Sequence, residues 1–288
     1  INATIDPVRH RFQGADTLTY GNHSPHPLDV LWLQLDQNIY RADSRSAEAM
    51  PSRRGQSTDG IRIASVEVEA GGKRQAAHFL VDDTRMRVDL PQPLAGHGKS
   101  LKLHVRYDYT VPGTWGGRTA VTPSRNGDIV DIAQWYPRMA VYDDLRGWDT
   151  LPYLGSEFYL EYGDFDYAVT VPWDYLVAGS GALVNGKDVL TRTQQQRLAQ
   201  AVNSDRTVLI RTPAEVGDPA SRPTHEGMQT WRFHMDHTRD VAFAASPAFV
   251  WDAARINLPG GGHSLAMSVY PVEAVGKDKW NRSTEYLK

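Results

Sequence analysis

The amino-acid sequence predicts a mainly β-stranded protein built as a sandwich or saddle of antiparallel sheets. Apolar and polar residues alternate over many short segments, and this alternation has the period of a half-buried strand. The 24 glycines and 17 prolines punctuate the chain between those segments, as turns require. Helix-forming stretches are few, so sheets packed on sheets are expected to enclose the core.

Most of the predicted strands lie in the first half of the chain. Alternating segments occur at residues 8–12, 17–20, 29–37, 61–69, 85–90 and 101–111. Gly14 to Asp16 separate the first two segments and are expected to break them into two strands. In the third segment Leu31, Leu33 and Leu35 lie on one side and Val30, Trp32 and Gln34 on the other, as in a strand. The fourth segment slips by one residue near Ala64 and Ser65, which indicates a β-bulge.

Two short helices are predicted in the second half. Residues 193–202 begin with Thr193, a residue suited to capping a helix, and residues 278–288 place Trp280 and Leu287 at helical spacing. The sequence changes in character near residue 255, where a glycine-rich joint precedes one more strand at 264–272. We therefore expect one β unit over 1–255 and the beginning of a second unit over 256–288.

Composition narrows the classes of function. The chain has 31 basic and 34 acidic residues without a clustered basic face, which argues against nucleic-acid binding. No apolar run approaches the roughly 20 residues that span a bilayer. The absence of cysteine removes disulfides and thiolate metal ligands. Both an envelope or periplasmic location and a cytoplasmic one stay open, and a membrane-attached parent protein is compatible with the sequence.

Motifs for metal binding or catalysis are incomplete. The segment from His225 to Gln229 begins like a zinc helix but lacks the second histidine. His234 and His237 lie three residues apart, so on a strand they point to opposite faces and are expected to be a structural pair. No G-x-S-x-G motif is present. We therefore predict neither a catalytic residue nor a metal site within this chain.

An aromatic-rich run extends from Gln134 to Asp166. It opens with Gln134, Trp135, Tyr136, Pro137 and Arg138, and its later aromatic positions include Tyr153 and Phe158. Aromatic side chains supply a large contact area with a polar handle, so such a loop is suited to lining a pocket. Packing against the edge of the sandwich is an equally good interpretation of these residues alone.

The run resembles the N-terminal domain of the aminopeptidase N and leukotriene-hydrolase family of zinc peptidases, in the version written QWYP-x-M-x-V-Y-D. Further segments match in the same order, at residues 22–25 (NHSP), 35–40 (LDQNIY) and 239–247 (RDVAFAASP). The resemblance covers most of the chain. It implies a saddle-like N-terminal β-domain over 1–255, followed by the first strand and helix of a thermolysin-like catalytic domain over 256–288.

The same resemblance implies where the chemistry of the parent protein lies. The G-x-M-E-N and HExxH motifs of the family are absent here, so zinc and its ligands are expected beyond Lys288. The chain starts at Ile1 and stops within a predicted helix, which suits a fragment of a zinc aminopeptidase. Its expected partners are its own catalytic domain and a peptide substrate.

Family members place a Gln-x-Glu or Gln-x-Gln segment of this domain in the pocket for the substrate's first residue. The resemblance puts Gln134 at the first position and Tyr136 at the third, so Tyr136 is expected to shape the pocket rather than hold the amine. Trp135 and Arg138 are further pocket candidates. Two alternatives stay open, namely a non-catalytic protein-binding scaffold of the same fold and an independent carbohydrate- or protein-binding sandwich, which the 8 tryptophans would suit.

Overall fold

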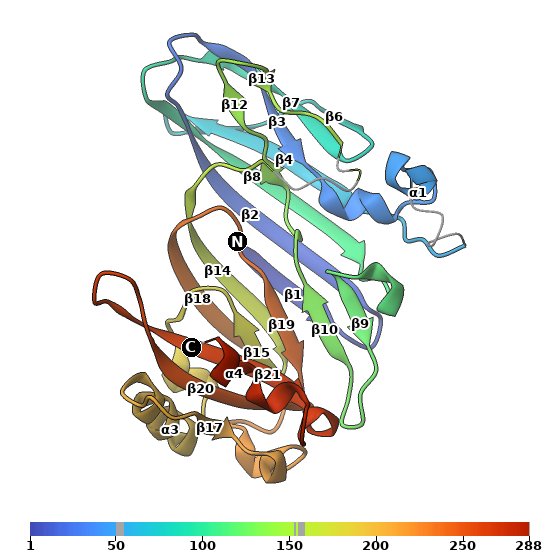
Figure 1. Ribbon diagram of the computed structural model, residues 1–288. Coiled ribbons are helices and arrows are strands. Elements are labelled where there is room, and N and C mark those ends of the chain that lie inside the picture. Colours follow the sequence, from blue (N-terminus) through green and yellow to red (C-terminus); the bar gives the residue numbers. More distant parts are fainter. Residues whose placement is uncertain (50–54, 153, 155–158, 288) are drawn as a thin grey trace.

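A computed structural model describes residues 1–49, 55–152, 154 and 159–287. Most of the ordered elements are strands in antiparallel sheets, so the prediction of a mainly β fold is confirmed. Figure 1 shows the long strands crossing the body of the molecule, with small sheets at both of its ends. Among the described residues, no helix has both the length and the apolar character that crossing a membrane requires.

The largest sheet has eight strands in the order β16-β18-β14-β1-β2-β8-β4-β5. Its strands are β1 (Asn2–Asp6), β2 (Arg11–Asn22), β4 (Arg62–Ala70), β5 (Lys73–Ala76), β8 (Lys99–Thr110), β14 (Gly163–Pro172), β16 (Ala182–Leu183) and β18 (Met228–Thr238). Neighbouring strands are antiparallel except β1 and β14, which run parallel. Pairing between β4 and β8 shifts between Ile63 and Ser65, which confirms the predicted bulge.

Smaller sheets cover this large one. The first contains β11 (Arg138–Met139), β3 (Leu28–Gln34), β7 (Arg85–Leu94) and β6 (Phe79–Asp82). The second contains β15 (Leu176–Gly179), β19 (Phe243–Ser246), β10 (Ile129–Ile132) and β9 (Ala120–Thr122). The others are β17 (Val208–Arg211), β20 (Phe249–Asn257) and β21 (His263–Pro271), and the pair β12 (Tyr142–Asp143) and β13 (Gly147–Trp148).

The helices are short and lie between strands. The α-helices are α1 (Arg45–Ala49), α2 (Gly186–Val189), α3 (Arg192–Val202) and α4 (Ser283–Tyr286). The 3-10 turns are η1 (Asp36–Tyr40), η3 (Thr114–Gly116), η4 (Pro213–Glu215), η5 (Pro219–Ser221), η6 (Val272–Ala274) and η7 (Trp280–Arg282). Thr191 rather than Thr193 caps α3, because the Gln194 amide donates to the Thr191 hydroxyl at 3.2 Å and the Gln194 side chain accepts from the Thr191 amide.

Two further predictions of elements need correction. Residues 8–12 and 17–20 do not form two strands. A turn follows β1, and after this turn β2 runs without a break from Arg11 to Asn22. Gly14 lies inside β2, where a Cβ would stand 2.1 Å from the Tyr107 ring, so this glycine permits a close approach instead of ending a strand. The predicted final helix is only η7 followed by α4, and Lys288 lies outside the described residues.

A continuous apolar core fills the space between the large sheet and the smaller ones. Leu31, Leu33 and Leu35, which share one side of the chain, are fully buried and join the same core as Trp135. Phe12 stacks on Tyr109 of β8 with ring centroids 4.7 Å apart. This core supports the loop between β10 and β11, which carries the predicted pocket residues.

The proposed boundary near residue 255 falls inside a strand. β20 runs through it and pairs with β21 in an antiparallel hairpin from Phe249–Pro271 to Asn257–His263. The glycine-rich segment forms the turn of this hairpin, with Gly260 and Gly261 both at a φ of 87°. The division into units 1–255 and 256–288 therefore stays a prediction.

Candidate functional site

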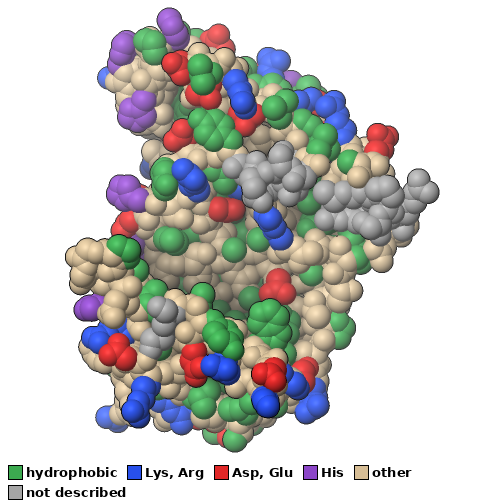
Figure 2. All heavy atoms as spheres, viewed as in Figure 1, with side chains coloured by type: hydrophobic (Ala, Val, Ile, Leu, Met, Phe, Trp, Pro, Cys, Tyr) green, Lys and Arg blue, Asp and Glu red, His purple; other side chains and the backbone are tan. Residues whose placement is uncertain are grey.

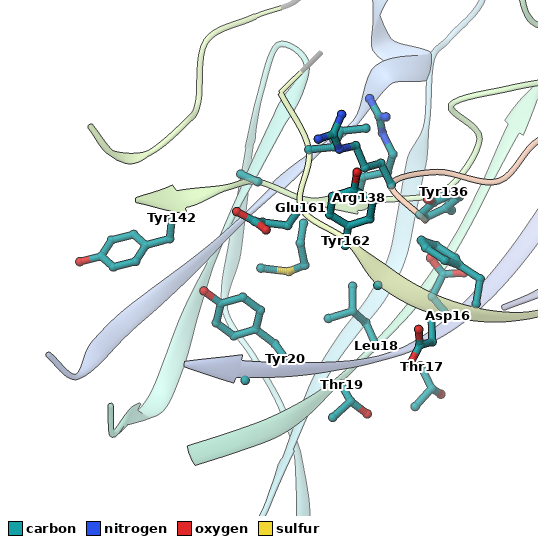
Figure 3. Close-up of a pocket in the computed structure, with 18 of the residues that line it drawn as sticks. Asp16, Thr17, Leu18, Thr19, Tyr20, Tyr136, Arg138, Tyr142, Glu161 and Tyr162 are labelled. Atoms are coloured by element: carbon teal, nitrogen blue, oxygen red, sulfur yellow. The ribbon is translucent and has the colours of Figure 1, made fainter. Parts of the chain in front are cut away.

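A cavity of about 840 Å³ opens between β2, the loop around β11 and β12, and the beginning of β14. Its walls come from residues within 16–24, 136–142 and 160–166, together with Ile1 and Arg239. Figure 3 shows Asp16, Tyr20, Tyr136 and Glu161 among these residues. Figure 2 shows that one face of the molecule is hollowed between its upper and lower parts. Tyr153 and Phe158 of the predicted aromatic run lie outside the described residues.

The structure separates the four predicted pocket residues. Tyr136 and Arg138 line the cavity, while Gln134 and Trp135 are not among its lining residues. Trp135 is fully buried in the core, where its Nε1 donates a 2.8 Å hydrogen bond to the carbonyl of Val241. Gln134 is 8% exposed. A pocket role for the four residues stays a prediction.

Gln134 adopts a left-handed backbone conformation with a φ of 54°. Residues other than glycine rarely adopt this conformation, and it persists where surrounding contacts hold it. Gln37 supplies one such contact, since its Nε2 donates to the carbonyl of Gln134 at 2.9 Å. Thr119 supplies another, since its hydroxyl donates to the carbonyl of Ala133 at 2.6 Å and accepts from the Ala133 amide at 3.2 Å. The turn is therefore fixed from two sides.

A buried ionic cluster fixes the residues that follow the turn. Arg138 is 2% exposed, and its Nε donates to Asp36 at 2.8 Å while its Nη1 donates to Asp240 at 3.2 Å. Tyr136 joins the cluster, because its hydroxyl donates to Asp240 at 2.8 Å. Burial raises the pKa of Asp36, and the neighbouring Arg138 guanidinium opposes that rise. Burial also raises the pKa of Tyr136 well above its usual range, so its hydroxyl stays protonated and donates.

Sequence reasoning missed Asp36, Gln37 and Asp240 as parts of this site. Both segments that contain them were already matched in the family resemblance, at residues 35–40 and 239–247. That match was the available signal. What it did not show is that the two segments meet at Arg138, which lies 102 residues from each of the two aspartates.

The cavity carries acidic groups at both ends. Asp16 is 7% exposed, and the hydroxyl of Tyr107 donates to its Oδ1 at 3.1 Å. Burial raises the pKa of Asp16 to about 7. Glu161 lies at the other end, near Tyr20. Arg239 lies at the edge, with its guanidinium 4.6 Å from the Tyr162 ring centroid.

His234 contacts two neighbouring acidic side chains. The two ring nitrogens of His234 lie 2.8 Å from Asp166 and 2.9 Å from Asp236, and these contacts raise the pKa of His234. His225 lies in the loop before β18 rather than on a helix. Within the described ranges, no group of three or more histidine, aspartate or glutamate residues has an arrangement that could hold a metal ion.

Comparisons with known proteins give matches in structure only. No protein-family model matches the chain, and no curated protein matches it in sequence. A two-domain M1 zinc metallopeptidase variant bound to L-tryptophan matches with a TM-score of 0.51 and 15% identity, over 99% of this chain and 50% of the other. An M1 zinc metallopeptidase variant from Deinococcus radiodurans, bound to a Tyr-Ser-Ala substrate, matches with a TM-score of 0.52 and 15% identity, over 99% of this chain and 49% of the other.

The chain thus spans about half the length of these peptidases. At this level of identity the likeness establishes the fold, and the activity of the whole protein is a matter for proposal. The chain has the fold of the N-terminal domain of an M1 zinc metallopeptidase.

Proposed function

We propose that this chain is the non-catalytic N-terminal domain of a zinc aminopeptidase, an enzyme that removes N-terminal residues from peptides. The observation that supports this proposal best is the likeness in fold to two-domain M1 zinc metallopeptidases over nearly the whole chain. In this proposal the rest of the longer protein contains the catalytic domain. Zinc, its ligands and the group that activates water belong there, because the described residues here contain no group that could hold the metal.

In this proposal the domain covers the active site and contributes one wall of the pocket for the substrate's first residue. The loop from Gln134 to Arg138 is the candidate wall. Gln37 and Thr119 fix its turn, and Asp36 and Asp240 fix its end. Binding groups need rigid support to select between substrates, and a loop held by buried polar contacts has that support.

The experiment that tests the proposal uses the longer protein that contains this chain. Purified protein should hold zinc and hydrolyse fluorogenic amino-acid amides, and a chelator should abolish the hydrolysis. Gln134→Ala should change the ratio of kcat/KM between two amides with different first residues. The melting temperature should change little, because the hydrogen bond that holds this left-handed turn goes to the backbone carbonyl of residue 134, which alanine keeps.

Gln200→Ala is a matched control, since Gln200 lies exposed on α3 and away from the cavity. The control should leave both the kcat/KM ratio and the melting temperature unchanged. A longer protein that neither holds zinc nor hydrolyses any amide would contradict the proposal and favour the protein-binding scaffold of the same fold.

A further inference from the structure

The Glu161 end of the cavity carries a carboxylate without an intramolecular cation. Glu161 is exposed, and it takes part in none of the ion pairs that the described part of the chain forms. Arg138, a buried cation in the cavity wall, is already paired with Asp36 and Asp240. Because two other carboxylates already pair with Arg138, the Glu161 carboxylate is accessible to a cationic group of an incoming ligand.

The aromatic ring of Tyr20 lies close to this carboxylate and belongs to a group of three rings. Tyr142 packs on Trp148 with centroids 5.0 Å apart, and Tyr20 lies 6.0 Å from the same ring. Burial, with the neighbouring Tyr142 hydroxyl and the Glu161 charge, raises the pKa of Tyr20 to about 12. The Tyr20 ring therefore stays neutral and close to Glu161, and Figure 3 shows both side chains around the same space. Aromatic faces beside a carboxylate attract organic cations.

An aromatic ring of the cavity already holds one cation of the chain itself. The Arg239 guanidinium lies over the Tyr162 ring at 4.6 Å. This contact shows that rings in the cavity wall can hold an organic cation, and no ion pair among the described residues joins Arg239 to Glu161.

We propose that the Glu161 end of the cavity binds the side chain of a basic residue of a peptide, a primary ammonium or guanidinium group on an apolar stem. Glu161 receives the charge, and the ring of Tyr20 lies close to it. Leu18 and Met139, which line the same cavity, provide apolar surface for the stem. A volume of about 840 Å³ is ample for such a side chain. The inference does not depend on the proposed function, because all residues of the proposed binding site belong to this chain.

The test is an NMR titration of the isotope-labelled 288-residue chain. The probes are N-acetyl-lysine methylamide and N-acetyl-norleucine methylamide, which have the same stem and differ in the terminal ammonium group. Both lack a free α-amine, so recognition of a peptide's N-terminus contributes nothing to the result. The lysine probe should bind about tenfold more tightly than the norleucine probe, and the shifted signals should centre on Leu18, Tyr20, Met139 and Glu161.

Three variants complete the test. Glu161→Gln should weaken binding of the lysine probe about tenfold. Tyr20→Leu should weaken it about three- to fivefold. Glu226→Gln, a control in the exposed loop before β18, should change nothing. Equal binding of the two probes, unchanged affinity in Glu161→Gln, shifts centred outside the cavity or no binding at all would each overturn the proposal.

Discussion

Replacing Arg138 by methionine tests whether the buried ionic cluster holds the loop after Gln134. The substitution keeps an apolar side chain of comparable length and removes the guanidinium. Asp36, 5% exposed, then loses its cation at 2.8 Å, whereas Asp240, 30% exposed, keeps access to water. Most of the cost therefore arises from the uncompensated charge on Asp36.

Removing one partner of a buried ion pair costs about 3–5 kcal/mol, against a total stability of about 5–15 kcal/mol for a folded domain. Arg138→Met should therefore lose about 3–5 kcal/mol of stability, which is most of the total only for a domain at the lower end of that range. The cost should also depend on pH. Without the guanidinium, the pKa of Asp36 in the folded variant rises further above its unfolded value. Because the folded variant then binds a proton that the unfolded chain releases, its stability falls as the pH rises.

Urea unfolding followed by tryptophan fluorescence at pH 5 and pH 8 measures both effects. The loss of stability relative to the unchanged chain should be larger at the higher pH. Arg9→Met is the control, since the Arg9 side chain is 81% exposed in its pair with Asp6, and it should not change stability measurably. A loss below about 1 kcal/mol for Arg138→Met, or a loss independent of pH, would refute this account of the cluster.

Three further predictions follow from single contacts. Thr119→Val should lower the free energy of unfolding by about 1–3 kcal/mol, because the backbone of Ala133 loses its hydroxyl partner. Thr119→Ser keeps the hydroxyl and should retain most of the stability. Equal unfolding midpoints of the two variants in urea would contradict this prediction. Gln134→Gly should leave the melting temperature unchanged or raise it, since glycine accepts a φ of 54° without strain, and a clear fall in a thermal scan would argue against strain there. The pKa of about 7 for folded Asp16 exceeds its unfolded value, so stability should fall as the pH rises from about 4 towards 7; Asp16→Asn should flatten that slope in pH-dependent unfolding, and an unchanged slope would disprove the assignment.

Local sequence patterns predicted much of the fold because successive side chains of a strand point to opposite faces, which leaves an alternating pattern in the sequence. The alternation over residues 29–37 predicted a strand, observed as β3, and a slip in alternation predicted the bulge near Ser65. The prediction from local pattern failed where a contact with a residue distant in sequence determines the structure. Gly14 looked like a break but lies inside β2 because Tyr107 of β8 packs over it.

The candidate site was predictable only in part, for the same physical reason. The family resemblance pointed to the loop from Gln134 to Arg138, and two of its residues, Tyr136 and Arg138, line the cavity. Their aspartate partners lie more than 100 residues away in sequence, so no spacing rule connects them. Trp135 follows a left-handed residue and points into the core, which alternation along a regular strand does not anticipate.

The most direct test of the central claim compares zinc-dependent hydrolysis by the longer protein and by this chain alone. Both are assayed at equal concentration with a fluorogenic amino-acid amide, with added zinc and after chelation. We predict zinc-dependent turnover by the longer protein and none by residues 1–288, whose described residues contain no group that could hold the metal. Zinc-dependent turnover by this chain alone would contradict the assignment of a non-catalytic domain.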